Sequence, residues 1–411
     1  MSFFSSRWVP QPEHVRDAGE GLPAGFRAGA AAAAIKTEGV LDVGLLVCDA
    51  QDAVSAARFT RSGVLAAPVL VTRDHSRMDR LRAVAANSAN ANAATGEPGM
   101  QVALEMQRAA GVAAGIYADQ VAVASTGVIG VALDPVVVAD GLAQAGSSLH
   151  PAGDVEFTEA IMTTDAFAKR ASLIVELPSG EVRLSAQAKG AGMIEPAFAT
   201  MLCFVQTDAA LEPETADLLL GVCVKRSFDR ISVDGQLSTN DTAILMCSGF
   251  SGVHVAPGSE DELRFGEALD ALLRMLALMM VRDGEGAARI GRVVVRGGHQ
   301  EAAERCARAV ANSPLVKTAL HGADPNWGRI AQAVGAALPG SAPLALDIAI
   351  EGNALCRDGA AVDHDQDALQ AAAQGEEIEY EVRIGPEGAE AEVFFSDLGH
   401  GYVTINAEYT T

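Results

Sequence analysis

The first half of the chain alternates short apolar runs with longer stretches of helical spacing. The runs at residues 41–47, 69–71 and 121–124 are rich in Val, Ile and Leu, which is the composition of buried strands. The stretches between them place apolar residues at the spacing of one helix face. Such a mixture predicts a layered α/β or α+β fold, in which helices and strands cover one another.

The pattern is clearer in the second half. A helix is expected at residues 213–228, with a proline in its first turn, and another at residues 260–281, where leucines gather on one side. A third helix should cover residues 299–313 and stop at Pro314. Strands are expected at residues 201–205, 230–234, 243–247, 292–295, 344–350, 379–384, 390–395 and 402–406.

The composition narrows the class of protein. With 411 residues, of which 49% are hydrophobic, the chain can bury a large core in two or three domains or in one large fold. Asp and Glu outnumber Lys and Arg by 53 to 30, so the formal net charge is −23. Phosphate backbones and anionic lipid repel such a chain, so we expect neither nucleic acid nor a membrane as a partner.

The cysteines and the apolar segments indicate a cytoplasmic protein. Six cysteines stand far apart and form no Cys-x-x-Cys pair, so we expect buried reduced thiols. The first residues lack a basic stretch followed by an apolar core, so no secretory signal is expected. The apolar stretch at residues 268–281 is interrupted by Asp270 and Arg274, and it predicts a core helix rather than a membrane span.

One stretch, residues 189–209, carries candidate chemistry. It places Thr200 behind the small residue Ala199, where a loop broken by glycine and proline meets a strand-like segment. A cut between these two residues would give Thr200 a free α-amino group, whose pKa of ~8 suits a general base for its own hydroxyl. On local grounds alone, a threonine before an apolar run is more often a strand residue or a helix cap.

A series of short blocks runs through the chain. The blocks are residues 87–92 (Asn-Ser-Ala-Asn-Ala-Asn), 95–96, 125–127 (Ser-Thr-Gly), 161–165, 189–194 (Lys-Gly-Ala-Gly-Met-Ile), 199–202, 238–242 (Ser-Thr-Asn-Asp-Thr), 282–286, 324–330 and 400–406, with Thr411 at the end. Any one block could arise by chance, whereas the ordered series is hard to obtain otherwise. In this series the chain closely resembles the self-processing ornithine acetyltransferases, the bifunctional glutamate N-acetyltransferases of the cyclic arginine pathway. The resemblance covers nearly the whole chain.

The resemblance implies a fold and a processing event. The fold would be the layered α/β (α+β) type of the ornithine acetyltransferases and self-processing aminopeptidases, which is N-terminal-nucleophile-like. Self-cleavage between Ala199 and Thr200 would yield an alpha chain, residues 1–199, and a beta chain, residues 200–411, with Thr200 as the nucleophile. The two chains would stay together in a heterotetramer or a larger oligomer.

The resemblance also assigns a site. Thr126 and Gly127 would form the oxyanion hole, with the hydroxyl and the amide as donors. By residue type, Lys189 could pair a substrate carboxylate and Glu285 an ammonium, although most isolated Lys and Glu side chains are surface charges. The substrate contacts implied by the resemblance are Thr163, Lys189, Thr200, Glu285, Asn406 and Thr411.

The implied reaction transfers an acetyl group from N-acetylornithine to glutamate in two steps, through acetyl-Thr200. No metal or organic cofactor is expected, since the sequence has no Walker motif, no complete dinucleotide fingerprint and no clustered Cys and His. The sequence leaves open whether acetyl-CoA is a second donor. Two alternatives remain: a self-processing N-terminal-nucleophile aminopeptidase or amidohydrolase that uses water as acceptor, and an uncleaved amino-acid-binding relative.

Three places depart from the family pattern. Ala89 stands where a glycine is usual, Gln236 where an acidic residue is usual, and Ala288-Arg289 where Thr-Lys is frequent. We expect these differences to affect fine substrate preference and not the reaction.

Overall fold

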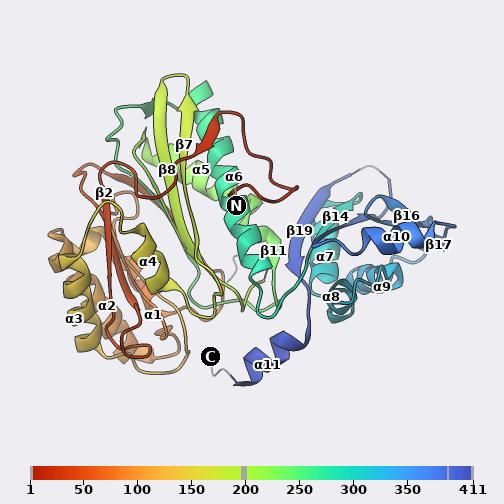
Figure 1. The fold of residues 1–411 in the computed structure, drawn as a ribbon, viewed down its shortest axis with the longest axis horizontal. Coiled ribbons are helices and arrows are strands. Elements are labelled where there is room, and N and C mark those ends of the chain that lie inside the picture. Colours follow the sequence, from red (N-terminus) through yellow and green to blue (C-terminus); the bar gives the residue numbers. More distant parts are fainter. Residues whose placement is uncertain (1–2, 196–200, 387, 409–411) are drawn as a thin grey trace.

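The computed structural model describes residues 3–195, 201–386 and 388–408, which form a mixed α/β fold (Figure 1). The helices are α1 (Ala67–His75), α2 (Gly96–Ala114), α3 (Pro135–Ser147), α4 (Asp154–Ile161), α5 (Pro213–Arg226), α6 (Glu260–Arg282), α7 (Gln300–Ala311), α8 (Pro314–His321), α9 (Trp327–Ala337), α10 (Gln366–Ala372) and α11 (His400–Glu408). The strands are β1 (Val15–Asp17), β2 (Phe26–Ala31), β3 (Val43–Cys48), β4 (Val54–Phe59), β5 (Ala83–Asn87), β6 (Val121–Ser125), β7 (Lys169–Leu177), β8 (Gly180–Lys189), β9 (Leu202–Thr207), β10 (Ala210–Leu211), β11 (Ile231–Ser232), β12 (Thr242–Cys247), β13 (His254–Val255), β14 (Ile290–Arg296), β15 (Asp347–Ile350), β16 (Asn353–Arg357), β17 (Ala360–Ala361), β18 (Glu377–Arg383) and β19 (Glu390–Ser396). The layered α/β class expected from the sequence is confirmed.

Two sheets and two layers of helices build the first part of the molecule. A six-stranded sheet has the order β1-β7-β8-β9-β12-β4, and a four-stranded sheet has the order β2-β3-β5-β6. Helices α5 and α6 cover the outer face of the first sheet, and α1, α2 and α3 cover the outer face of the second (Figure 1). The sheets pack face to face, so the layers follow the order helix, sheet, sheet, helix.

The alternation of side chains along each strand decides which core they enter. Leu202 and Phe204 of β9 enter the core between the two sheets, whereas Cys203 and Val205 pack with the core of α5 and α6. All six residues of β9 are buried. A strand buried on both faces lies between two packed layers, and β9 therefore lies at the centre of the layered structure.

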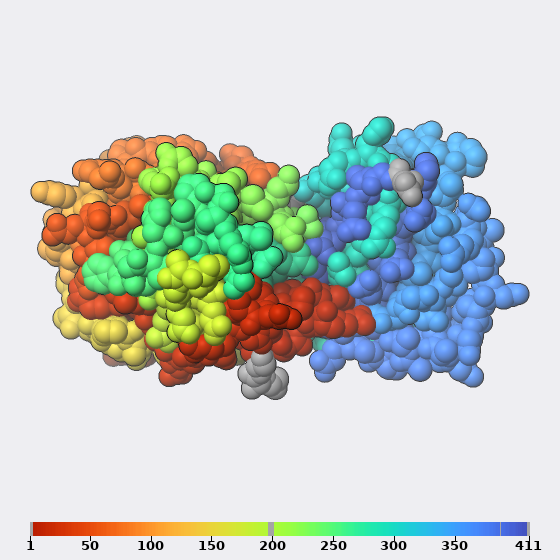
Figure 2. Space-filling model, turned by 90° about the horizontal axis from the view of Figure 1, so that it is seen from above, coloured from red at the N-terminus to blue at the C-terminus, as the bar shows by residue number. Residues whose placement is uncertain are grey.

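The last third of the chain adds a second core. A seven-stranded sheet of order β11-β19-β14-β18-β15-β16-β17 packs one face against α7, α8, α9 and α10, around residues such as Val293, Ile348 and Phe395. Its opposite face meets α6 and Trp8 of the N-terminal segment. Figure 2 shows this segment, in red, lying across the junction between the green and blue parts of the molecule. The N-terminal segment thus helps to join the two cores.

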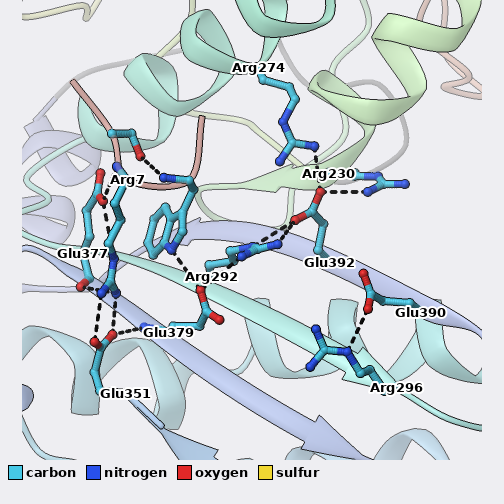
Figure 3. Close-up of polar contacts among 12 residues, drawn as sticks. Arg7, Arg230, Arg274, Arg292, Arg296, Glu351, Glu377, Glu379, Glu390 and Glu392 are labelled. Atoms are coloured by element: carbon cyan, nitrogen blue, oxygen red, sulfur yellow. Dashed lines mark hydrogen bonds and ion pairs between the residues drawn. The ribbon is translucent and has the colours of Figure 1, made fainter. Parts of the chain in front are cut away.

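Charged side chains link the seven-stranded sheet to α6 (Figure 3). Glu392 of β19 pairs with Arg230, with Arg274 of α6 and with Arg292 of β14, at 2.8, 2.8 and 2.7 Å. Burial alone would raise the pKa of Glu392, but the arginines outweigh it and hold the pKa at about 2. Arg7 extends the cluster with two glutamates of its own. We call this group the arginine–glutamate cluster; its members are Arg7, Arg230, Arg274, Arg292, Glu351, Glu377 and Glu392.

Most elements expected in the second half are confirmed. The helices expected at residues 213–228, 260–281 and 299–313 are α5, α6 and α7, and their ends differ by at most two residues. Pro314 not only follows the end of α7 but also begins α8. At the first position of a helix the backbone N–H has no partner within the helix, so a proline there loses no hydrogen bond. The strand expected at residues 344–350 is confirmed only over Asp347–Ile350.

Two expected strands are wrong. Residues 69–71 lie in helix α1, where contacts with β6 and α2 outweigh the strand preference of valine. Residues 402–406 lie in helix α11. Among the described residues, no strand lies beside this alternating segment to pair with it, and none of the residues of α11 is buried. Alternating apolar and polar residues stabilise a strand only when a neighbouring strand pairs with it and one face is buried.

The cysteines and the apolar helix agree with expectation. All six cysteines are buried and unpaired. The apolar stretch at residues 268–281 lies within α6, and most of its side chains are buried in the core. In the part of the chain that the structure describes, no helix combines the length and the apolar character needed to span a membrane.

Candidate active site

A cavity of about 210 Å³ lies between the segments that follow β6, β8, β11 and α6, with α11 closing one side. Polar side chains from widely separated parts of the sequence meet there. Ala199, Thr200 and Thr411 lie outside the described residues. The remaining residues expected for the site all line the cavity: Thr126, Gly127, Thr163, Lys189, Glu285 and Asn406.

The Thr126-Gly127 pair directly follows β6. Gly127 has a φ of +133°, and a Cβ at this position would stand 2.2 Å from the backbone of Ala89, so only glycine fits. The amides of Thr126 and Val128 donate to the carbonyls of Asn87 and Ala89. Among the described residues, no acceptor takes the amide hydrogen of Gly127. This hydrogen is therefore available to a ligand in the cavity.

Lys189 ends β8 and is 3% exposed. Its Nζ donates to Oγ1 of Thr126 at 3.0 Å, so the Thr126 hydroxyl keeps its own hydrogen for another acceptor. Burial lowers the pKa of Lys189, although the charge of Asp165 opposes this shift. The structure therefore adds a contact that the sequence did not predict, between a substrate-binding candidate and an oxyanion-hole candidate.

A buried ion cluster lies behind Lys189. Nζ of Lys169 donates to Oδ1 of Asp165 at 2.7 Å and to Oδ2 of Asp283 at 2.6 Å. Burial alone would raise the pKa of Asp165, but Lys189 and Lys169 outweigh it and hold the pKa at about 2. Asp165 also accepts the amide hydrogen of Thr163 at 3.0 Å. One carboxylate thus binds Lys169 and the Thr163 segment of the cavity wall, and its charge attracts that of Lys189.

Glu285 and Asn406 meet at another part of the wall. Glu285 follows α6, and its Oε2 accepts from Nδ2 of Asn406 at 2.7 Å. A Cβ on Gly192 would stand 2.7 Å from the carboxyl carbon of Glu285, so this glycine leaves room for the carboxylate. Asn406 lies one turn after Tyr402 on α11, and this spacing brings both to the cavity. With Lys189, the cavity offers groups of both charges, as recognition of an amino acid requires.

Three further cavity residues were not singled out from the sequence. Asp234 accepts the hydroxyl hydrogen of Tyr402 at 3.3 Å, which ties α11 to the end of β11. Asn240 donates to the carbonyls of Ala91 and Ser125 at 2.7 and 2.9 Å and supports the backbone beside Thr126. Asn240 could have been found from the sequence, because it belongs to one of the family-like blocks, residues 238–242. Tyr402 likewise belongs to the block at residues 400–406, whereas Asp234 lies in none of the blocks.

The departure from the family pattern at Ala89 affects the backbone conformation. Ala89 adopts a φ of +71°, which is the left-handed region that glycine occupies without strain. For alanine this conformation costs about 1–2 kcal/mol. Gln236, the second departure, is exposed at the cavity wall. The loop of Ala89 is therefore strained beside the backbone of Gly127.

Comparison with known proteins places the chain: the model of the ArgJ family matches residues 27–411, and the chain belongs to that family. A protein of Symbiobacterium thermophilum named arginine biosynthesis bifunctional protein ArgJ is 41% identical over 393 residues, 95% of this chain and 98% of that protein. The glutamate N-acetyltransferase of Methanocaldococcus jannaschii is 38% identical over 410 residues, 97% of this chain and 100% of that protein. Among solved structures, ArgJ of Bacillus halodurans is 32% identical, covers 50% of this chain and 98% of its own, and has a TM-score of 0.48.

Proposed function

We propose that this chain is an acetyltransferase of arginine biosynthesis that moves an acetyl group from N-acetylornithine to glutamate. Family membership supports the reaction class, because relatives at 41% and 38% identity are named arginine biosynthesis bifunctional protein ArgJ and glutamate N-acetyltransferase. The observation that carries the proposal is the meeting in one cavity of two oxyanion donors with groups of both charges. These groups are Thr126, Gly127, Lys189 and Glu285.

The proposed chemistry proceeds in two half-reactions. The Thr200 hydroxyl attacks the acetyl carbon of N-acetylornithine while the α-amine of Thr200 takes the hydroxyl proton. The Thr126 hydroxyl and the Gly127 amide donate to the oxyanion, and each such donor contributes about 3 kcal/mol. The C–N bond then breaks, the proton passes to the leaving amine, and ornithine departs from acetyl-Thr200. The amine of glutamate attacks this ester, forms N-acetylglutamate and restores Thr200.

The charged groups are assigned to substrate recognition. Lys189 would hold the α-carboxylate, and Glu285 would hold an ammonium, with Thr163, Asn406 and Thr411 as further contacts. Both substrates carry a carboxylate and differ in the group at the far end of the side chain, so one cavity has to serve both. Every proton in the scheme moves between Thr200 and the substrates, so no metal or organic cofactor is required.

The nucleophile is proposed to arise by self-cleavage between Ala199 and Thr200. The products would be residues 1–199 and residues 200–411, which stay together and assemble into a heterotetramer or a larger oligomer. The word bifunctional in the names of the relatives makes acetyl-CoA a second donor to test.

Incubation with N-acetylornithine alone tests the proposal. We expect a burst of ornithine equal to the number of active sites, and mass spectrometry should find one acetyl group on the first residue of the fragment 200–411. Glutamate should discharge it. An aminopeptidase or amidohydrolase would pass the acetyl group to water and form no N-acetylglutamate, and an uncleaved binding protein would run as one band on a denaturing gel.

The same assay with acetyl-CoA in place of N-acetylornithine decides whether the second donor is used. Rapid-quench samples without any acetylated fragment, together with initial-rate plots that intersect, would contradict the two-step route through Thr200.

A further inference from the structure

The loop between β11 and β12, residues 233–241, contacts the chain on both sides of the proposed cleavage site. Asp234 stands near the start of this loop and Asp241 at its end. Their carboxyl groups bind backbone amides, one upstream and one downstream of residues 196–200. A single loop therefore fixes two points of the chain that are separated in sequence by the candidate scissile bond.

The upstream contact is dense. The carboxylate of Asp234 accepts the amide hydrogens of Met193 at 2.7 Å and Ile194 at 2.9 Å, one on each oxygen. In the opposite direction, the carbonyl of Ile194 accepts the amides of Val233 at 2.9 Å and Gly235 at 3.2 Å. Met193 has a φ of +56°, a conformation that a side chain adopts only when its surroundings impose it. The chain is thus held in a defined path here.

The downstream contact uses the second carboxyl group. Oδ1 of Asp241 accepts the amide hydrogen of Met201 at 3.0 Å, and the carbonyl of Met201 accepts the amide of Thr242 at 3.0 Å. Asp241 is 1% exposed. The amide nitrogen that Asp241 binds is covalently joined to the carbonyl carbon of Thr200, so this contact fixes the chain directly after the proposed nucleophile.

We propose that Asp234 and Asp241 are positioning residues for self-cleavage, because they hold both ends of the segment that contains the scissile bond. The inference rests on the proposed cleavage between Ala199 and Thr200. In that step the Oγ of Thr200 forms a bond to the carbonyl carbon of Ala199, the peptide C–N bond breaks, and the hydroxyl proton ends on the freed amine. Water then opens the ester and leaves a carboxylate on Ala199.

Anchoring matters because the attack is geometrically demanding. The hydroxyl oxygen must come within about 3–3.5 Å of the carbonyl carbon in a suitable direction. A segment held at only one end spreads over many backbone conformations, and ordering each residue costs about 1–2 kcal/mol. Two anchors on one loop remove much of this freedom before the reaction begins. After cleavage, the Asp234 contact would join the two fragments.

The two carboxyl groups differ in what their contacts require, and this difference provides the test. Both oxygens of Asp234 accept hydrogen bonds, which come from Met193, Ile194, Gln236 and Tyr402. An asparagine at this position would replace one accepting oxygen by an NH₂ group, which cannot accept the hydrogen bond that this oxygen received. At Asp241, Oδ1 accepts the amide hydrogen of Met201, and burial raises the pKa of the carboxyl group well above the ordinary range despite the nearby hydroxyls of Ser238 and Thr60. A neutral amide that keeps one acceptor oxygen should therefore replace it.

Cell-free synthesis, sampled over time on denaturing gels, measures the rate at which the two fragments appear. We expect Asp234→Asn and Asp241→Ala to slow cleavage about tenfold or more, because each removes an acceptor from a buried amide. Asp241→Asn, which keeps its acceptor, should stay within about threefold of wild type. The exposed Asp363→Asn is the matched control and should cleave as wild type does.

Melting temperatures are measured with the same substitutions in a Thr200→Ala background, where cleavage cannot occur, so that effects on folding are read separately. Equal rates in wild type and Asp234→Asn would overturn the inference. So would an equal loss in Asp234→Asn and Asp241→Asn that follows their melting temperatures, because this is the outcome of general destabilisation. A wild-type chain that stays intact would instead overturn the cleavage step on which the inference rests.

Discussion

The contact between Lys189 and Thr126 joins two functions at a single hydrogen bond. Nζ of Lys189 donates at 3.0 Å to the hydroxyl that is proposed to stabilise the oxyanion. A hydroxyl that accepts from a cation becomes a better donor, because hydrogen bonds in a chain polarise one another, and burial strengthens the effect. Lys189 would then serve both substrate binding and the orientation of the Thr126 hydroxyl.

A double-mutant cycle tests this coupling. Lys189→Met and Thr126→Val should each lower kcat/KM about 100-fold, since one preorganised oxyanion donor contributes about 3 kcal/mol. The double variant should lose much less than the product of the two effects, because both substitutions disable the same hydroxyl. Lys225→Met, an exposed lysine on α5, provides the control and should leave kcat/KM unchanged. Losses that multiply would show that Lys189 acts on the substrate alone.

Among the elements, β19 is held to α6 and β14 by the arginine–glutamate cluster around Glu392. The lowered pKa of Glu392 determines how the contribution of this cluster to the free energy of unfolding changes with pH. The unfolded pKa is 4.5 and the folded pKa is about 2, so the stabilisation is present above about pH 4.5 and is lost as the pH falls toward 2. Loss of one partner of a buried ion pair is costly, because the remaining charges stay buried without compensation.

Glu392→Gln should therefore destabilise the protein. The shift in pKa corresponds to about 3 kcal/mol in the free energy of unfolding at pH 7, and the difference from wild type should shrink at pH 3. Urea unfolding at both values measures it. Glu390→Gln, on the same strand but exposed in its pair with Arg296, should change the free energy of unfolding by less than about 1 kcal/mol. An equal difference at pH 7 and pH 3 would contradict the assignment.

For the whole molecule, the six-stranded sheet interleaves the two proposed fragments. Strand β8, before the proposed cut, pairs antiparallel with β9 after it, and β4 from the first fragment pairs with β12 from the second. The strands of the two fragments thus share backbone hydrogen bonds and one hydrophobic core. Cutting the chain near residue 200 would remove none of these contacts.

The cleaved protein should therefore behave as one particle. We expect both fragments to elute together in size-exclusion chromatography, in the same volume as the uncleaved Thr200→Ala variant. They should separate only in denaturant, because burial of the shared core resists dissociation. Elution of a fragment alone from the native column would contradict this expectation and the arrangement of the sheet.

The sequence pattern was sufficient to predict a helix or strand wherever the residues that determine it lie within the same segment. Helix α6 has a serine cap at Ser259, an apolar stripe and a glycine beyond its end, and its expected bounds differ by one residue. Strand β12 contains a continuous apolar run, residues 243–247, and its expected bounds also differ by one residue. The site residues came instead from blocks that resemble a family. Neither periodicity nor spacing showed that Thr126 and Asn406 would line the same cavity.

The sequence alone established the α/β class, the main helices and strands, the buried cysteines and the candidate residues, because each depends on neighbours along the chain. Only the tertiary structure decided which of these residues meet. Residues 402–406 alternate as a strand would, yet they form α11, since none of the sheets in the described part of the chain has a free edge beside them. Asp234 and Asp241 have partners from segments brought to them by packing. A buried polar group must find its hydrogen bonds, and the packing of the layers determines which groups lie within reach.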